Sequence, residues 1–459
     1  MVFSSITFIY FFLPAILIAY YIVPKKHRNL VLLLFSLLFY FYGERNIVLI
    51  LSCLLNYTFG TIIGKTKDKK YLILGIITNI AILMYYKYSN FFISNINNLL
   101  NINIQYLNII LPLGISFFTF QNMSYLIDVY KQDVPVQKNL VKYATYITLF
   151  PQLIAGPIVR YKDVDNEISN RRENFENFSN GVIRFIIGLS KKVIIANTIG
   201  EMATILNQMV SKTVVSHILE AIGYTIQIYF DFSGYSDMAI GLGLMFGFHF
   251  KENFNYPLIA KSITDFWRRW HISLTSFFRD YIYIPLGGNR VSKAKWIRNI
   301  LVVWALTGFW HGASWNFIIW GLYFFIFLIL EKLFLHKLLK NGLISHVYTL
   351  GIVLVSFVIF NMPDLKSIGI FLKNMTGFGN LSFINAETIY YLKNYLSLLV
   401  IAFISATPIL KNLTNKIKEK WNIAFVIDTL QTISIFSLLI ITTASLLSSS
   451  FNPFIYFRF

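Results

Sequence analysis

The feature that most constrains this 459-residue sequence is one long apolar run, Leu301 to Phe334, with a single histidine near its middle. A helix needs about 20 apolar residues to cross a membrane, so the run is too long for one crossing and too short for two full ones. Lysines and arginines flank it on both sides, and such clusters stay on the cytoplasmic side. We therefore expect the chain to enter the membrane, turn between Gly308 and Ala313, and return, which places His311 at depth.

The composition indicates a polytopic integral membrane protein. Of all residues 56% are hydrophobic and only 13% are charged, whereas a soluble domain carries about 25% charged residues. The net charge of +19 comes from lysines and arginines in short loops between apolar runs, as expected of cytoplasmic loops beside anionic lipid. No basic soluble domain is apparent that would bind nucleic acid. We expect an all-α fold with about eleven membrane segments, some re-entrant or partial, in a single integral-membrane domain over residues 1–459.

Basic clusters after the first spans predict the orientation of the chain. The run from Phe3 to Val23 lacks the features of a cleaved signal peptide and reads as a first span. The basic stretch Lys25–Arg28 follows it, which predicts an N-terminus outside the cell. A second basic stretch, Lys65–Lys70, comes two spans later and agrees in sidedness. The Asn-rich stretch from Asn90 to Asn108 predicts a loop with an interfacial helix.

Proline and glycine interrupt two apolar stretches, Leu111–Gln121 and Phe150–Arg160. Interrupted backbone at membrane depth persists only where it is buried in protein or lines a wet cavity. These stretches therefore indicate an internal passage, with a pair of ordinary kinked helices as the alternative. In a third stretch, Gln227 to Asp237, two aspartates lie in apolar surroundings. Asp231 and Asp237 are either helix caps at a break or ligands of a site.

The region from Lys251 to Arg298 mixes basic and aromatic residues, which is typical of interfacial helices. Ser262 can cap a helix that starts near Phe266, and Pro285–Asn289 predicts a turn. The basic side chains of this region either bind the phosphates of a donor molecule or simply hold the region in the cytoplasm. They include Lys261, Arg268, Arg269 and Arg279.

Two histidines are candidates for chemistry, His271 and His311. A neutral histidine accepts a hydroxyl proton near neutral pH, and burial keeps it neutral. A lone histidine on an apolar face is nevertheless more often structural. No metal site is expected, because the chain has a single cysteine, Cys53, and no carboxylates at metal-ligand spacing near these histidines. Neither a phosphate-binding glycine loop nor a serine nucleophile elbow occurs.

Three stretches resemble the membrane-bound O-acyltransferases (MBOAT family), and within them the branch that acetylates bacterial polysaccharides such as alginate. They are FWRRWHISL at 266–274, FRDYIYIPLGGNR at 278–290 and TGFWHGA at 307–313. Shorter stretches at 114–117, 156–158, 229–238 and 453–459 also resemble the family. The turn at 285–290 favours the polysaccharide or peptidoglycan acetylation branch over the related D-alanyl exporters of teichoic acids.

The resemblance implies a ring of membrane helices around a thin centre, with a tunnel from the cytoplasm to the outer face. It implies that His311 is the catalytic residue and that His271 is a second important histidine, for which support of the funnel is the alternative role. Trp310 and Trp315 would wall the site and exclude water. The residues expected to line the tunnel or bind substrate are Trp310, Trp315, Asn316, Asp231, Gln227, Trp267, Arg268, Arg269, Arg279 and Tyr281.

The resemblance also implies a reaction and its partners. An acyl group, expected to be acetyl, leaves a cytoplasmic thioester such as acetyl-CoA, with no resident cofactor. His311 acts as general base or as transient acyl carrier. A separate extracytoplasmic acetyltransferase of the SGNH type then places the group on an exopolysaccharide or on peptidoglycan, outside the bacterial cell membrane. D-alanyl transfer to teichoic acids and a non-catalytic carrier are the alternatives. The absence of internal sequence repeats counts against a carrier.

Overall fold

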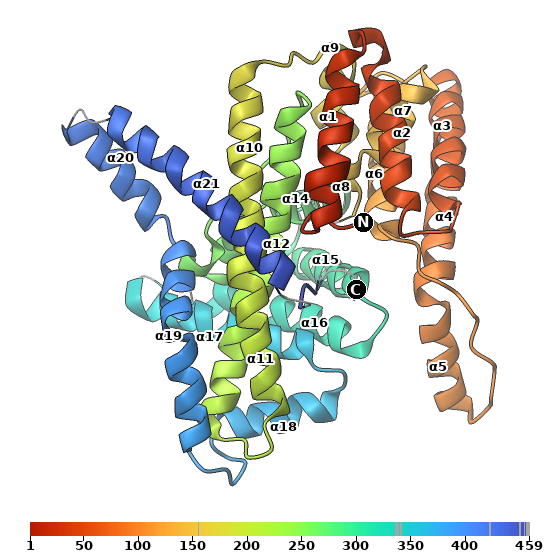
Figure 1. The fold of residues 1–459 in the computed structure, drawn as a ribbon. Coiled ribbons are helices and arrows are strands. Elements are labelled where there is room, and N and C mark those ends of the chain that lie inside the picture. The colour runs from red at the N-terminus through yellow and green to blue at the C-terminus, as the bar shows by residue number, and fades with distance from the viewer. Residues whose placement is uncertain are drawn as a thin grey trace. The chain divides into compact units, whose positions relative to one another are not determined.

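The computed structural model describes residues 1–154, 156–335, 339, 342–421, 424–448, 451–453 and 455. Over these residues every regular element is a helix, which confirms the all-α fold class (Figure 1). The end of the family resemblance, residues 454 and 456–459, lies outside the described part of the chain. Contacts divide the chain into unit 1, Met1–Phe185 with Tyr235–Lys251, and unit 2, Ile186–Gly234 with Glu252–Phe459. The single domain expected over residues 1–459 stays a prediction.

Unit 1 is built from the N-terminal helices, with η marking short 3₁₀ or π turns. They are η1 (Phe8–Phe12), α1 (Leu13–Ile22), η2 (Lys25–His27), α2 (Arg28–Phe41), α3 (Val48–Thr66), α4 (Lys69–Leu83), η3 (Met84–Tyr88), α5 (Ser89–Leu100), α6 (Ile115–Tyr130), α7 (Leu140–Thr148), α8 (Phe150–Leu153) and α9 (Tyr161–Asn170). Two helices have residues in both units, α10 (Phe175–Ser190) and α12 (Val214–Met245).

Unit 2 holds the remaining helices and every residue predicted for the site. Its elements are η4 (Lys191–Asn197), α11 (Thr198–Gln208), η5 (Pro257–Ile259), α13 (Ile263–Arg269), α14 (Ile272–Phe278), η6 (Arg279–Tyr283), α15 (Lys293–His311), α16 (Trp315–Leu330), η7 (Glu331–Leu335), α17 (Gly342–Asn361), α18 (Leu365–Met375), α19 (Ala386–Ser405), α20 (Ile409–Trp421) and α21 (Ala424–Ser448).

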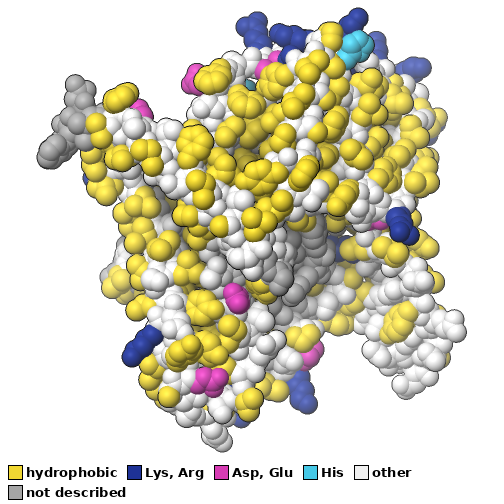
Figure 2. Space-filling view, viewed as in Figure 1, with side chains coloured by type: hydrophobic (Ala, Val, Ile, Leu, Met, Phe, Trp, Pro, Cys, Tyr) yellow, Lys and Arg dark blue, Asp and Glu magenta, His cyan; other side chains and the backbone are white. Residues whose placement is uncertain are grey.

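Six helical stretches of the described chain are long and apolar enough to cross a membrane. They are Val48–Thr66, Lys69–Leu100, Trp315–Leu335, Gly342–Asn361, Ala386–Ser405 and Phe425–Ser448, with a shorter apolar stretch at Phe8–Ile22. Apolar side chains also cover much of the surface in view (Figure 2). The protein is therefore a multi-pass membrane protein, but the expected count of about eleven segments is not confirmed.

The Asn-rich stretch after residue 89 differs in part from the prediction. Instead of a separate interfacial helix, α5 continues α4 through η3, and only the residues after Leu100 form a loop. The helical stretch Lys69–Leu100 contains a window apolar enough to cross a membrane. The two basic stretches of unit 1 behave as expected: α1 to α4 bring the residues around 25–28 and 65–70 to the same end of that unit (Figure 1).

The two Pro- and Gly-containing stretches of unit 1 do interrupt their helices. Helix α6 begins only after Gly114, which has a φ of +72°, and α8 ends at Leu153 after one turn. The chain beyond α8, as far as it is described, is buried and irregular up to Arg160. A Cβ on Gly114 would lie 2.5 Å from the carbonyl oxygen of Leu153, so the two interruptions touch. Ordinary kinked helices are thereby excluded, while the internal passage stays a prediction.

The long apolar run forms a tight helical hairpin, as predicted. Helix α15 ends at His311 and α16 begins at Trp315, and the two pack side by side (Figure 1). A Cβ on Gly308 would lie 2.4 Å from the carbonyl oxygen of Phe317, and one on Gly321 2.3 Å from that of Trp304. The helices approach this closely because both positions lack side chains, a pattern common where membrane helices touch.

We expect Gly308→Ala to destabilise the protein by about 1–3 kcal/mol, because the new methyl group meets backbone that cannot rotate away. Thermal unfolding of the protein in detergent, followed by the loss of monodisperse protein, measures the effect. Gly351→Ala is the matched control, since it also lies inside a helix but an added Cβ there meets no atom within 4 Å. Equal melting temperatures for the two variants would contradict the close approach.

Candidate active site

Helix α13, which carries Arg268 and Arg269 and leads to His271, is held at its start by two caps. The Ser262 hydroxyl accepts a hydrogen bond from the backbone N–H of Asp265 at 3.0 Å, which confirms the predicted cap. The carboxylate of Glu331, in η7 after α16, accepts from the N–H groups of Ile263 and Thr264. Because these groups have no partner within the helix, Glu331 ties the hairpin to α13. Sequence reasoning missed it, since an acid at the end of an apolar run reads only as a span end.

His271 lies at the junction of α13 and α14 and is completely buried. Its φ of +45° is in the left-handed region, which costs about 1–2 kcal/mol for a residue with a Cβ. The Phe232 ring stands edge-on to the imidazole, with 4.7 Å between ring centroids. His271 is outside the candidate membrane spans, and burial lowers its pKa to about 3. The imidazole is therefore neutral at physiological pH.

His311 is the last residue of α15, and its side chain enters an aromatic pocket. Only 6% of the residue is exposed. Ring centroids of Trp310, Trp320 and Phe360 lie 4.9, 4.8 and 5.3 Å from the imidazole. Trp310 also lies 6.1 Å from the imidazole of His271. The structure thus brings the two predicted histidines to one tryptophan.

The tryptophan that walls His311 on the α16 side is Trp320, which sequence reasoning missed. The predicted wall residue Trp315 is 55% exposed, whereas Trp320 is 2% exposed. Trp320 lies deeper in α16, on the face that the glycine contact brings against α15. Asn316 is buried and donates a hydrogen bond to the carbonyl oxygen of Phe360 at 3.1 Å, which links α16 to the end of α17.

Trp267 and Tyr281 occupy different surroundings. Trp267 packs edge-on against Trp304 at 4.7 Å and Trp320 at 5.6 Å between ring centroids, so it connects α13 to the wall of the His311 pocket. Tyr281 is buried in η6, with its ring 4.8 Å from that of Phe277. Trp267 therefore shares the neighbour Trp320 with His311.

The four predicted basic residues fall into two pairs. Arg269 and Arg279 already form ion pairs with neighbouring acids: Nε of Arg269 lies 2.9 Å from Asp265, and Nε of Arg279 lies 2.7 Å from Asp280. Arg268 and Lys261 are exposed. Within the described part of the chain, no acid forms an ion pair with Arg268 or Lys261, and their role in binding phosphate stays a prediction.

Neither aspartate of the third motif caps a helix break, because α12 runs without interruption through both. Asp231 lies 2.6 Å from the ammonium of Lys192, and Asp237 lies 2.6 Å from the guanidinium of Arg184. Because these cations neutralise the carboxylates, both aspartates can lie inside a continuous helix. Lys192 itself is only 2% exposed, although its place in an apolar run predicts that it reaches out to the membrane surface or ends the span early.

Lys192 and Asp231 also hold residues near the C-terminus, Pro453 and Ile455. The Lys192 ammonium donates to Asn197 at 2.8 Å and to the carbonyl oxygen of Pro453. The other oxygen of Asp231 accepts from the backbone N–H of Ile455 at 2.9 Å. Asp231 thus helps to fix Ile455 against α12.

Gln227 lines a cavity of about 370 Å³ between α11, α12 and the residues Phe451, Pro453 and Ile455. Its wall is partly polar, since Asn207 donates to Glu220 at 2.6 Å along it. The lining also includes Asn361, which follows the His311 neighbour Phe360 in sequence. The cavity therefore reaches the end of α17, next in sequence to the His311 neighbour Phe360.

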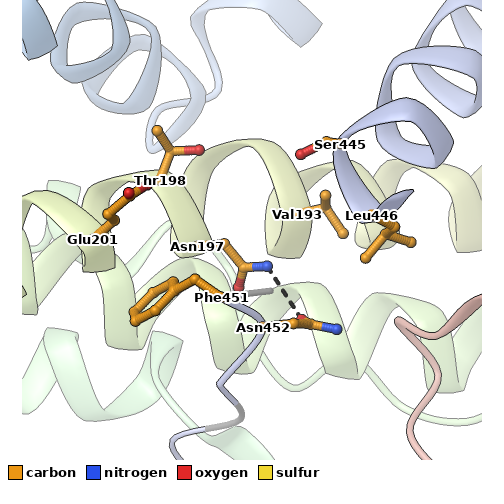
Figure 3. A pocket seen from close by; sticks show the side chains of 8 residues that line it. All are labelled: Val193, Asn197, Thr198, Glu201, Ser445, Leu446, Phe451 and Asn452. Carbon is orange, nitrogen blue, oxygen red and sulfur yellow. Dashed lines mark hydrogen bonds between the residues drawn. The ribbon is translucent and has the colours of Figure 1, made fainter. Parts of the chain in front are cut away.

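A second cavity of about 130 Å³ shares Phe451 with the first (Figure 3). Asn197 donates to Asn452 across it at 3.1 Å. Helix α21 contributes Ser445 and Leu446 to the wall. No residue predicted for the site is among the described residues that line it.

Several buried polar atoms around the histidines have no hydrogen-bond partner among the residues that the structure describes. They are Nε2 of His271, Nε1 of Trp267, Nε1 of Trp320 and Oδ1 of Asn316. Buried polar atoms are nearly always paired in folded proteins, and exceptions gather where a ligand or water completes the bonding. This concentration of both donors and acceptors fits a substrate-binding site.

Sequence comparison shows which known proteins this chain is similar to. A sequence model of the MBOAT, membrane-bound O-acyltransferase, family matches residues 135–370. The probable alginate O-acetylase of Pseudomonas aeruginosa is 42% identical over 80% of this chain and 73% of its own length. The peptidoglycan O-acetyltransferase of Helicobacter pylori is 35% identical over 83% and 81%. The teichoic acid D-alanyltransferase of Bacillus subtilis is 32% identical, but over 47% and 58% only.

The matched residues 135–370 contain both histidines, the hairpin and the cap of α13. The similarity to the two acetylating relatives extends well beyond them. With its all-helical, multi-pass architecture, the chain belongs to the membrane-bound O-acyltransferase family and is an O-acyltransferase.

Proposed function

We propose that this acyltransferase takes an acetyl group from a cytoplasmic thioester, such as acetyl-CoA, and delivers it to the outer side of the bacterial cell membrane. There the group serves the O-acetylation of an extracytoplasmic polysaccharide. The observation that carries the proposal is the placement of His271 and His311 at Trp310, among buried polar atoms left for a substrate.

His311 is the proposed catalytic residue. A neutral imidazole can act as general base toward an incoming hydroxyl or can itself carry the acyl group briefly. The rings of Trp310, Trp320 and Phe360 surround it. Excluding water in this way protects a reactive acyl group from hydrolysis.

The donor side is proposed to use exposed basic residues. Arg268 and Lys261 would attract the phosphates of a coenzyme A donor, since arginine matches phosphate geometry well. The donor is a substrate in this scheme, and no resident cofactor is required. Basic stretches in the short loops support a cytoplasmic position for this side and an N-terminus outside the cell.

The proposed acceptor, a polysaccharide, is inferred from the names of the relatives. One is named an alginate O-acetylase and another a peptidoglycan O-acetyltransferase, both with polysaccharide acceptors. We infer that a separate extracytoplasmic SGNH-type acetyltransferase places the group on the glycan. The cavity beside Gln227 is the proposed exit, because its polar wall adjoins the end of α17.

The test measures ester-linked acyl groups on surface glycans by mass spectrometry, with and without the gene. Loss of acetate that the wild-type gene restores is the expected result, and the fragment that loses it names the glycan. Loss of D-alanine would instead assign the protein to teichoic acid acylation. If neither ester changes, the proposed function is wrong. Consumption of acetyl-CoA by the purified protein separates an enzyme from a carrier that does no chemistry.

A further inference from the structure

The buried side chain of Asn253 brings together the groups around His271. Its side-chain oxygen, Oδ1, accepts hydrogen bonds from the backbone N–H of Ser273 at 3.1 Å and from the Ser273 hydroxyl at 2.8 Å. The same oxygen faces Nδ1 of His271 at 3.2 Å. Asn253 and His271 are both completely buried.

These contacts determine which ring nitrogen carries the proton. A backbone N–H can only donate, so the atom of Asn253 that faces Ser273 must be the carbonyl oxygen and not the amide nitrogen. The ordinary ambiguity of an asparagine side chain is therefore resolved here. The Ser273 hydroxyl also lies 3.4 Å from Nδ1, but its one hydrogen is donated to Asn253 at 2.8 Å. The acceptor opposite Nδ1 therefore requires that Nδ1 bears the hydrogen, and a neutral imidazole then leaves the lone pair on Nε2.

The backbone supports the same arrangement. The N–H of Ile272 donates to the backbone carbonyl oxygen of Asn253 at 3.0 Å. The N–H of Asn255 donates to the backbone carbonyl oxygen of Arg269 at 2.9 Å. The segment 253–255 thus pairs with 269–272 and holds His271 in its left-handed conformation. Strained backbone of this kind persists where the surroundings over-determine it.

We propose that Asn253 is a positioning residue that fixes His271 as the Nδ1–H tautomer and presents Nε2 as a hydrogen-bond acceptor to an N–H or O–H group of the substrate. Nε2 is buried, and no partner for it exists among the described residues. Trp310 separates it from the His311 pocket by a single ring. This inference rests on the proposed function for the identity of the substrate, but not for the tautomer.

The first test needs no variant. Nitrogen-15 NMR of histidine-labelled wild-type protein in nanodiscs distinguishes the two tautomers, and the His271 signal is assigned as the one missing from His271→Gln. We expect a protonated Nδ1 and an unprotonated Nε2. A protonated Nε2 in the wild type would overturn the proposal whatever the enzyme's activity.

The second test compares Asn253→Leu with Asn253→Asp in acetyl transfer from acetyl-CoA. The leucine removes the acceptor, and we expect kcat to fall at least about 10-fold with a smaller change in KM, the size typical for losing a supporting hydrogen bond. The aspartate keeps the acceptor and should restore kcat at high pH. Ser276→Ala is the control, since its hydroxyl binds the Ile272 carbonyl oxygen and not Asn253.

The aspartate variant gives a further readout that a merely structural role would not produce. The groups recorded around His271 are the rings of Phe232 and Trp310 and the side chains of Asn253 and Ser273, none of them charged. A carboxylate at 253 favours the protonated imidazole and so raises the pKa of His271. As the pH is lowered, Asn253→Asp should therefore lose activity at a higher pH than the wild type does. Wild-type kcat in Asn253→Leu would refute the inference, whereas an inactive wild type would refute the proposed function instead.

Discussion

Replacing His311 by alanine is expected to abolish acyl transfer without lowering the amount of protein in the membrane. A general base contributes about 10²–10⁴-fold to a rate, so kcat/KM should fall at least about 100-fold. The side chain contacts three rings and ends α15, and its loss leaves the glycine contact of the hairpin intact. Ester-linked acetate on the surface glycan, after complementation of a deletion strain, measures the effect in cells.

His249→Ala is the matched control, because this histidine belongs to unit 1 and is largely exposed. It should restore acetylation fully. Glycan acetate at the wild-type level in the His311→Ala strain would show that another group carries the chemistry. The purified variant, given acetyl-CoA, tells loss of catalysis from loss of the partner interaction.

Replacing Lys192 by methionine is expected to destabilise the protein strongly. Asp231 would remain buried without its cation, and breaking a buried ion pair on one side costs about 3–5 kcal/mol. The hydrogen bond from the Lys192 ammonium to the carbonyl oxygen of Pro453 would also be lost. Thermal unfolding in detergent should show a melting temperature well below that of the wild type.

The double variant Lys192→Met/Asp231→Leu separates charge from packing. Replacing both charges by apolar groups is often neutral, so the double variant should be more stable than Lys192→Met alone. Lys191→Met is the control, since Lys191 is only partly buried. If the double variant is the least stable of the three, the buried pair is not the source of the effect.

The sequence predicted those features that depend on local pattern. The hairpin turn beside His311, the Ser262 cap and the helix interruptions at Gly114 and after Leu153 follow from apolar run length, capping chemistry and helix-breaking residues. Each is decided within about a dozen residues of chain, which is the range over which such patterns act.

What the sequence did not predict depends on residues far apart in the chain. Asp231 appeared to need a helix break, because nothing nearby in sequence neutralises it, and its cation lies 39 positions earlier at Lys192. Glu331 caps a helix that begins at Ile263. Trp320 took the place expected for Trp315, because the Gly308 contact decides which face of α16 meets α15. Only tertiary packing contains this information.

The position of Trp310 has a consequence for how the two histidines can be understood. One ring stands beside both imidazoles, so a change at either histidine alters the packing of a group that the other one uses. Free-energy changes of residues that share a neighbour do not add. His271, Trp310 and His311 therefore act as one unit of three rings. The rate lost on replacing one histidine measures the effect on this whole unit and not the contribution of that residue alone.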